Sequence, residues 1–120
     1  MAIVLAVDDS KSMRDMVSLT LRQAGFDVVE AADGQQALGL ARGKAVNLVI
    51  TDINMPNMDG ITLIRELRAL PSYRFTPILT LTTESGPARK QEGKVAGATG
   101  WIVKPFQPQQ LIDTVKKVLR

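Results

Sequence analysis

Short apolar runs alternate with helix-forming segments along the chain. The runs are rich in valine, isoleucine and leucine, and most are continuous rather than interrupted at every second residue. Such runs are typical of strands that are buried on both faces of a sheet. The predicted strands are residues 3–7, 27–30, 47–51, 77–82 and 100–103, and the predicted helices are residues 12–24, 34–42, 60–70, 86–97 and 108–119. Five strand–helix units predict an α/β fold, with a doubly wound, five-stranded parallel sheet and five helices on its two faces.

The predicted helices differ in how much apolar surface they offer to the sheet. In four of them, mostly apolar residues fall on one helical face. These residues are Met13, Met16, Val17, Thr20, Leu21 and Ala24 in the first helix, Ala37, Leu40 and Ala41 in the second, Leu63, Ile64, Leu67 and Leu70 in the third, and Leu111, Ile112, Val115, Val118 and Leu119 in the last. Segment 86–97 has Val95 as its one large apolar residue, and Gly93 interrupts it at a cost of about 1 kcal/mol relative to alanine. We therefore expect this helix to pack thinly and to move easily.

Carboxylates directly follow two of the predicted strands. Asp8 and Asp9 come after the first strand, and Asp52 comes after the third. Because ligands of doubly wound folds bind at the carboxyl ends of the strands, these acids are expected to meet at one edge of the sheet. Thr82 ends the fourth strand and Lys104 follows the fifth, so both are expected at the same edge.

The predicted cluster favours a hard divalent cation. Three carboxylates at one place repel each other, and oxygen ligands suit Mg²⁺ or Mn²⁺. The chain has no cysteine and no histidine, which excludes thiolate and imidazole ligands and a histidine base. Mg²⁺ leaves positions for a phosphate, whose oxygens a hydroxyl and an ammonium group would complement. Asp52 stands alone and is the better candidate for a nucleophile that forms an aspartyl phosphate, whereas Asp8 and Asp9 are placed as a pair to hold the metal.

Each of these residues also has an ordinary structural interpretation. Asp8 or Asp9 could simply cap the helix that follows, and Asp52 could belong to a plain turn with Asn54 and Pro56. A threonine at the end of a strand is usually structural, and a lysine before a proline usually lies in a solvated loop. The joint pattern favours a site, because five such residues at the right strand ends are not expected by chance.

The composition indicates one soluble domain. The 120 residues are 45% hydrophobic and 22% charged, and the apolar stretches are too short to cross a bilayer. The net charge of +3 is spread along the chain, and the few aromatic residues are not interleaved with basic ones. Nucleic acid is therefore not an expected partner. No N-terminal signal pattern is present, and we expect a cytoplasmic monomer.

Several short strings around the strand ends are shared with one known family. They are residues 7–10 with 13–14, residues 52–56 with 58–60, and residues 81–84, 97–98 and 104–106. On these strings the chain resembles the receiver domains of two-component response regulators over essentially its whole length, residues 1–120. It is most similar to the single-domain chemotaxis regulators of the CheY type, which have a flavodoxin-like sheet with strand order 2-1-3-4-5.

The resemblance implies a role for each residue of the predicted cluster. Asp52 is the phosphoacceptor, Mg²⁺ is bound by Asp8, Asp9, Asp52 and the backbone carbonyl of Asn54, and Thr82 and Lys104 contact the phosphoryl group. The Lys104–Pro105 bond is expected to be cis, although sequence alone favours trans. The phosphoryl donor is a phosphohistidine on a CheA-like sensor histidine kinase, and the protein is a signalling switch rather than an enzyme.

The same resemblance places the output surface on the fourth helix, the fifth strand and the fifth helix. The expected partner is a phosphorylation-dependent target, with a flagellar motor switch as one candidate. Basic residues on this surface suggest an acidic partner segment, and a merely solvated surface is the alternative: Arg89, Lys90, Lys94, Lys116 and Lys117.

One residue of the switch differs from the usual residue of the family. The family's switch aromatic, usually tyrosine or phenylalanine, is Trp101 here. Its larger ring, which donates but does not accept a hydrogen bond, could alter the rotamer switch, contact the partner or be a packed core residue.

Asn54 and Glu84 lie two residues after Asp52 and Thr82, where they influence in the family how water reaches the acyl phosphate. We predict a phosphorylated lifetime of seconds to minutes.

Three other functions were compatible with parts of the pattern. A phosphatase of the haloacid dehalogenase type wants an aspartate two residues after its nucleophile, but Asn54 and Ser10 occupy those places. A flavodoxin-like mononucleotide carrier wants a phosphate loop without acids after the first strand. A phosphate sink, which drains phosphoryl groups from a shared kinase, is compatible with every residue of the site.

Overall fold

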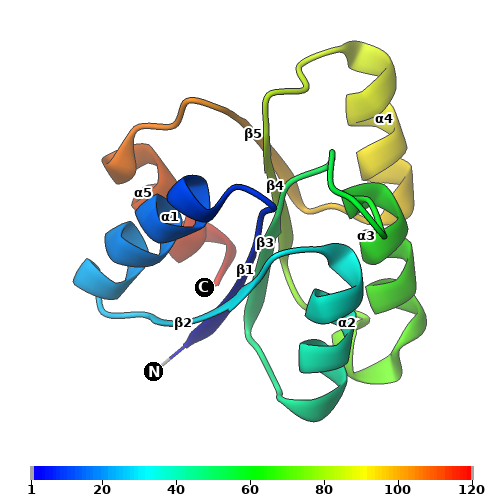
Figure 1. Cartoon of the computed structure of the whole chain (residues 1–120), viewed down its shortest axis with the longest axis horizontal. Helices are drawn as coiled ribbons and strands as arrows, with labels where there is room; N and C mark the ends of the chain where they lie inside the picture. Colours follow the sequence, from blue (N-terminus) through cyan, green and yellow to red (C-terminus); the bar gives the residue numbers. More distant parts are fainter. Residues whose placement is uncertain (1, 120) are drawn as a thin grey trace.

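Five parallel strands form one sheet with helices on both faces (Figure 1). The computed structural model describes residues 2–119. The strands are β1 (Ile3–Val7), β2 (Asp27–Ala31), β3 (Leu48–Thr51), β4 (Ile78–Thr82) and β5 (Gly100–Val103). The helices are α1 (Lys11–Gln23), α2 (Gly34–Gly43), α3 (Gly60–Ala69), α4 (Pro87–Ala96) and α5 (Pro108–Val118), with a short 3₁₀ helix η1 (Pro71–Tyr73) before β4. The observed strand order, β2-β1-β3-β4-β5, confirms the predicted fold class.

The continuous apolar runs are explained by two cores, one on each face of the sheet. In β1, Leu5 and Val7 pack into the core beneath α2, α3 and α4, whereas Val4 and Ala6 pack into the core beneath α1 and α5. Successive side chains of a strand point to opposite faces, so a strand covered on both faces needs apolar residues at every position.

One residue predicted to lie on the apolar face of its helix is exposed, and that prediction was wrong. Met16 in α1 is 52% exposed, because the covered arc of this helix is centred on Val17 and Leu21. Val95 in α4 is 74% exposed. Helix α4 instead buries Gly93 and Ala96, whose small size lets the helix backbone approach its neighbours closely. The helix thus lacks a large side chain that anchors it to the sheet.

Arg68 holds the carboxyl end of α4 in place. Its guanidinium group donates hydrogen bonds to the carbonyl oxygens of Tyr73 at 2.7 Å, of Thr76 at 2.6 Å and of Gly97 at 2.8 Å. Gly97 ends α4 in the left-handed conformation, with φ of 119°. One side chain of α3 therefore ties the carboxyl end of α4 to the segment that leads into β4.

Backbone hydrogen bonds extend beyond the strands at the carboxyl edge of the sheet. The N–H of Asp52 donates to the carbonyl of Val7 at 3.0 Å, and the N–H of Lys104 donates to the carbonyl of Thr82 at 2.8 Å. The residues that follow β3 and β5 are therefore held in the line of the sheet. Between residues 2 and 119, none of the helices has the length and apolar character that a membrane span requires.

Candidate functional site

Three carboxylates meet at this edge of the sheet. Asp8 and Asp9 follow β1, Asp52 follows β3, and these strands are neighbours. One carboxylate oxygen of each residue lies within 4.8 Å of the others. Asp8 is 5% exposed and Asp52 is 8% exposed, whereas Asp9 faces solvent. The predicted cluster of acids is thus formed, with two members enclosed by protein and one open to water.

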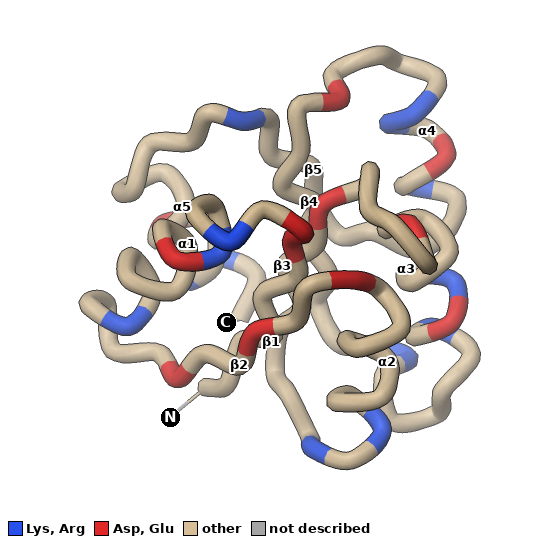
Figure 2. The backbone as a smooth tube through the Cα atoms, viewed as in Figure 1, with Lys and Arg blue, Asp and Glu red and all other residues tan. Residues whose placement is uncertain are grey.

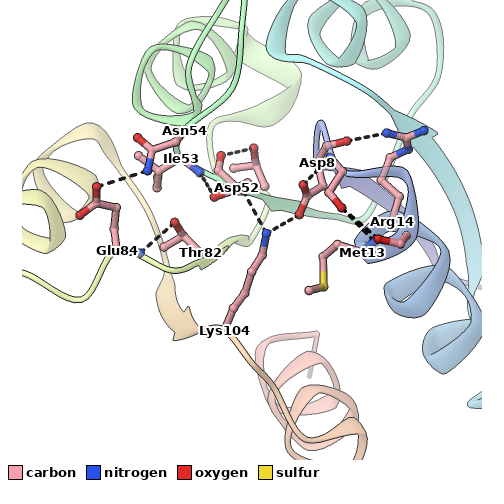
Figure 3. Close-up of polar contacts among 12 residues, drawn as sticks. Asp8, Met13, Arg14, Asp52, Ile53, Asn54, Thr82, Glu84 and Lys104 are labelled. Carbon is pink, nitrogen blue, oxygen red and sulfur yellow. Dashed lines mark hydrogen bonds and ion pairs between the residues drawn. The ribbon is translucent and has the colours of Figure 1, made fainter.

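Lys104 bridges the two buried carboxylates (Figure 3). Its Nζ lies 2.6 Å from Oδ2 of Asp8 and 3.0 Å from Oδ2 of Asp52. The lysine follows β5, two strands away from Asp52 in the sheet. The Lys104–Pro105 bond is cis, as the family resemblance implied. The interpretation of this lysine as a solvated loop residue was wrong, because only 10% of its side chain is exposed.

Burial and hydrogen bonding act in opposite directions on the pKa of Asp8 and on the pKa of Lys104. Burial raises the pKa of Asp8 above the usual 3.8, although hydrogen bonds from Lys104 and Ser10 act in the opposite direction. Burial alone would lower the pKa of Lys104, but hydrogen bonds with Asp8 and Asp52 outweigh it, and the pKa lies above the usual 10.5. An ion pair alone would lower the pKa of Asp8, so the cost of removing this carboxylate from water exceeds the gain from its lysine.

The cap of α1 is Ser10, not an aspartate. Its hydroxyl accepts the N–H of Met13 at 3.3 Å, and its own N–H donates to Oδ1 of Asp8 at 2.9 Å. Arg14, to which sequence reasoning assigned no role, donates to the backbone carbonyl of Asp8 at 2.7 Å. Because Ser10 supplies the cap, the interpretation of Asp8 or Asp9 as the helix cap was wrong, and both carboxylates face the cluster.

Asp52 is oriented by the segment that follows it. Its Oδ1 accepts the N–H of Ile53 at 2.6 Å, and Ile53 is fully buried. Gly60, the first residue of α3, donates its N–H to the carbonyl of Ile53 at 2.8 Å. A plain turn would leave Asp52 in solvent, whereas here buried neighbours hold its carboxylate beside Lys104.

The hydroxyl of Thr82 lies at the same edge and is fully enclosed. Its Oγ1 accepts the N–H of Glu84 at 3.2 Å. The carboxylate of Glu84 in turn accepts a hydrogen bond from the side-chain amide of Asn54 at 3.2 Å (Figure 3). Asn54 and Glu84, which follow Asp52 and Thr82 by two positions, are therefore in direct contact at the opening of the site.

Trp101 lies behind this loop rather than in the site. Its indole N–H donates to the backbone carbonyl of Glu84 at 2.8 Å, and the side chain is half-buried. The ring also lines an open depression between α4 and β5. Trp101 is therefore neither a fully packed core residue nor a freely exposed one.

The donor atoms fit a hard divalent cation. All three clustered side chains offer carboxylate oxygens, and the chain contains no thiol or imidazole that would favour another metal. Asp9 is exposed, so an ion held there would keep part of its water shell, as Mg²⁺ commonly does. The contribution of the Asn54 carbonyl remains a prediction.

A family model for the response regulator receiver domain matches residues 4–116. The chain belongs to the response regulator receiver domain family. A chemotaxis protein CheY homolog of Campylobacter jejuni (strain 81-176) is 42% identical over 118 residues, which cover 97% of this chain and 91% of that protein. The chemotaxis protein CheY1 of Helicobacter pylori (strain J99) is 40% identical, with 97% and 95% coverage.

Solved structures of other receiver domains have the same fold. Chemotaxis protein CheY4 of Vibrio cholerae is 53% identical, with a TM-score of 0.95 and coverage of 98% of each chain. The receiver domain of sensor histidine kinase PA1611 from Pseudomonas aeruginosa PAO1 is 27% identical, with a TM-score of 0.92 and coverage of 98% and 97%. That structure has a magnesium ion coordinated in its active site cleft. These similarities favour the receiver interpretation over a phosphatase or a mononucleotide carrier.

Proposed function

We propose that the chain is a phosphorylation-operated switch of two-component signalling, in which Asp52 accepts a phosphoryl group from a phosphohistidine of a CheA-like sensor kinase. The observation that carries this proposal is the arrangement of Asp52 between a carboxylate cluster and the ammonium group of Lys104. An isolated nucleophilic carboxylate would repel a phosphoryl donor, but here a cation site and a lysine stand next to it. The receiver domain then spans residues 1–120, and its cytoplasmic location and monomeric state stay predictions.

The residues of the site have distinct tasks in the transfer. An oxygen of Asp52 forms a bond to phosphorus while the bond between phosphorus and the histidine nitrogen breaks, and that nitrogen keeps the electron pair. Lys104 offsets the negative charge of the phosphoryl oxygens from one side. Asp8, Asp9, Asp52 and the Asn54 carbonyl would hold Mg²⁺, which would supply further positive charge to offset the negative charge of the phosphoryl oxygens. Thr82 would donate its hydroxyl to a phosphoryl oxygen after it leaves the N–H of Glu84.

The output surface consists of α4, β5 and α5. A depression of about 390 Å³ lies between α4 and β5, and Lys90, Lys94 and Trp101 are among its lining residues. Arg89 is paired with Glu92 at 3.0 Å. Lys90 and Lys94 thus lie beside the ring of Trp101 in this depression, and Figure 2 shows basic residues along α4. Such a surface fits a partner segment with both acidic and apolar residues.

Chemical phosphorylation tests the function directly. Acetyl phosphate with Mg²⁺ is expected to give one acid-stable, base-labile adduct per chain, and a chelator or Asp52→Asn is expected to abolish it. Asp27→Asn, which changes an exposed aspartate of β2 outside the cluster, is the matched control and should label normally. Multiple turnover of unrelated phosphoesters, or equal labelling of Asp52→Asn, would contradict the proposal.

Helix α1 offers a docking surface for the phosphodonor. Met13, Met16 and Leu19 follow one another at three-residue spacing on α1, and the last two are 52% and 60% exposed. Because α1 starts two residues after Asp9, a donor helix that brings its histidine to Asp52 can pack on these side chains. Met16→Lys is expected to slow transfer from the kinase about tenfold and to leave labelling by acetyl phosphate unchanged.

The control for this prediction is Val95→Lys, which places the same new charge on an exposed residue of α4. It should leave transfer from the kinase unchanged. Equal slowing by both variants, or slowing of the acetyl phosphate reaction by Met16→Lys, would contradict docking on α1. Both rates are measured as the appearance of labelled protein with time.

A further inference from the structure

Glu84 is held by three separate contacts, each made by a different group. Its N–H donates to Thr82, its carboxylate accepts from Asn54, and its carbonyl accepts from the indole of Trp101. Among residues 2–119, the indole provides the only hydrogen bond that reaches the main chain of loop 83–86 from another strand. The position of this loop therefore depends on a side chain that does not touch the carboxylate cluster.

The indole can reach the loop because α4 carries a glycine beneath it. A Cβ atom built on Gly93 would lie 2.6 Å from Cζ3 and 3.2 Å from Cε3 of Trp101. Both distances are too short for a methyl group, so any other residue at this position must displace the ring. By contrast, a Cβ atom built on Gly39, in the interior of α2, would have no neighbouring atom within 4 Å. A close approach of the ring explains why α4 tolerates a residue that weakens helices.

We propose that Gly93 and Trp101 form a matched pair that positions Glu84 against Asn54, and that this pair thereby sets the lifetime of the phosphoryl group on Asp52. The inference rests on the proposed function, since it concerns the acyl phosphate formed there. The Glu84–Asn54 contact is made by solvent-accessible side chains near Asp52, and we infer that water attacking the acyl phosphate must pass it. Trp101 acts through Glu84 and is a positioning residue, because it bonds the loop and not the reacting atoms.

Removal of the indole N–H tests the positioning role. Trp101→Phe keeps an aromatic ring but frees the Glu84 carbonyl, so the loop is released and water gains access. The expected lifetime of the adduct is about three- to tenfold shorter, which corresponds to the loss of one hydrogen bond. In the Glu84→Ala background the same substitution should have no further effect, because there is no carboxylate left to position. An unchanged lifetime in Trp101→Phe, or full additivity with Glu84→Ala, would overturn the proposal.

A stability cycle tests the pair without any phosphorylation. Gly93→Ala is expected to lower the thermal unfolding midpoint by about 5 °C and to shift the emission of the single tryptophan, because the ring is displaced. In the Trp101→Phe background, where the smaller ring leaves room for a methyl group, Gly93→Ala should raise the midpoint instead. Gly39→Ala, the matched control, should raise the midpoint in both backgrounds. A higher midpoint for Gly93→Ala in the presence of Trp101 would overturn the pairing.

The two sets of measurements separate this inference from the proposed function. If the unaltered protein takes no phosphoryl group from acetyl phosphate with Mg²⁺, the proposed function fails, whereas the stability cycle still reports on the Gly93–Trp101 pair. If the protein is labelled but the lifetime does not respond to Trp101→Phe, the function stands and the positioning role fails.

Discussion

Gly60→Ala is expected to lower the free energy of unfolding by about 3 kcal/mol and to slow phosphorylation of Asp52 strongly. A Cβ atom at position 60 would overlap the carbonyl oxygen of Asp52 and lie 2.9 Å from Cα of Ile53. These are backbone atoms, which cannot rotate away as a flexible side chain could. The junction between β3 and α3 must therefore shift, and the carboxylate of Asp52 shifts with it.

The comparison that isolates this effect is Gly39→Ala. Position 39 is helical and has open space around it, so alanine is expected to raise the free energy of unfolding by about 0.5–1 kcal/mol. Urea titrations of both variants measure the two changes, and acetyl phosphate labelling follows the site. A stabilised Gly60→Ala variant would show that the junction adapts without cost and would contradict the close contact.

Lys104→Met is expected to lower the free energy of unfolding by about 3 kcal/mol at neutral pH without Mg²⁺, the cost of leaving buried charges unpaired. The substitution removes the ammonium group that lies within 3.0 Å of both Asp8 and Asp52. Millimolar Mg²⁺ is expected to recover more than half of the loss, because the ion supplies the missing positive charge. Lys117→Met, at an exposed position of α5, is the control and should change stability little and independently of Mg²⁺.

The pH dependence of this effect follows from the pKa shifts of the pair. The pKa of Lys104 is raised above 10.5, so its contribution to stability is complete below 10.5 and is lost as the pH rises through its folded value. The pKa of Asp8 is raised above 3.8, so the neutral acid stabilises the fold below 3.8 and this contribution is lost as the pH rises. The difference between the unaltered protein and Lys104→Met should therefore shrink in acid and above pH 10.5. A difference that is constant with pH would contradict the ion pair.

The edge of the sheet that carries the site could be predicted, because the ends of the strands are marked in the sequence by the change from apolar to polar residues. Four of the five apolar runs stop at a residue that the site uses, and parallel strands bring these residues together whatever their separation along the chain. Asp52 and Lys104 are therefore neighbours although 52 positions separate them. The assignment of roles needed the resemblance to receiver domains, and those roles remain to be tested.

Contacts that depend on the packing of one element on another were not predictable. Helical spacing placed Met16 on the same face as Val17 and Leu21, but the width of the buried face depends on neighbouring elements that the sequence does not identify. Tyr73 is a further example, since its hydroxyl lies 2.6 Å from the carbonyl oxygen of Ala41 at the end of α2. The weakness of α4 was visible in its composition, whereas the reason for Gly93 became clear only with the indole above it.

The hydrogen bonds of Arg68 make the carboxyl end of α4 a fixed point about which the helix can rotate. The helix is fixed at its carboxyl end, where the guanidinium group holds Gly97, while its amino end begins at Gly86 without a side-chain cap. A rigid helix of this kind can pivot about Gly97 but cannot slide. Over its length of about 15 Å, a tilt of about 4° moves the first turn by about 1 Å. Small displacements beside Glu84 would thus be converted into a rotation of the surface that partners meet, with the pivot on the opposite side of the molecule from Asp52.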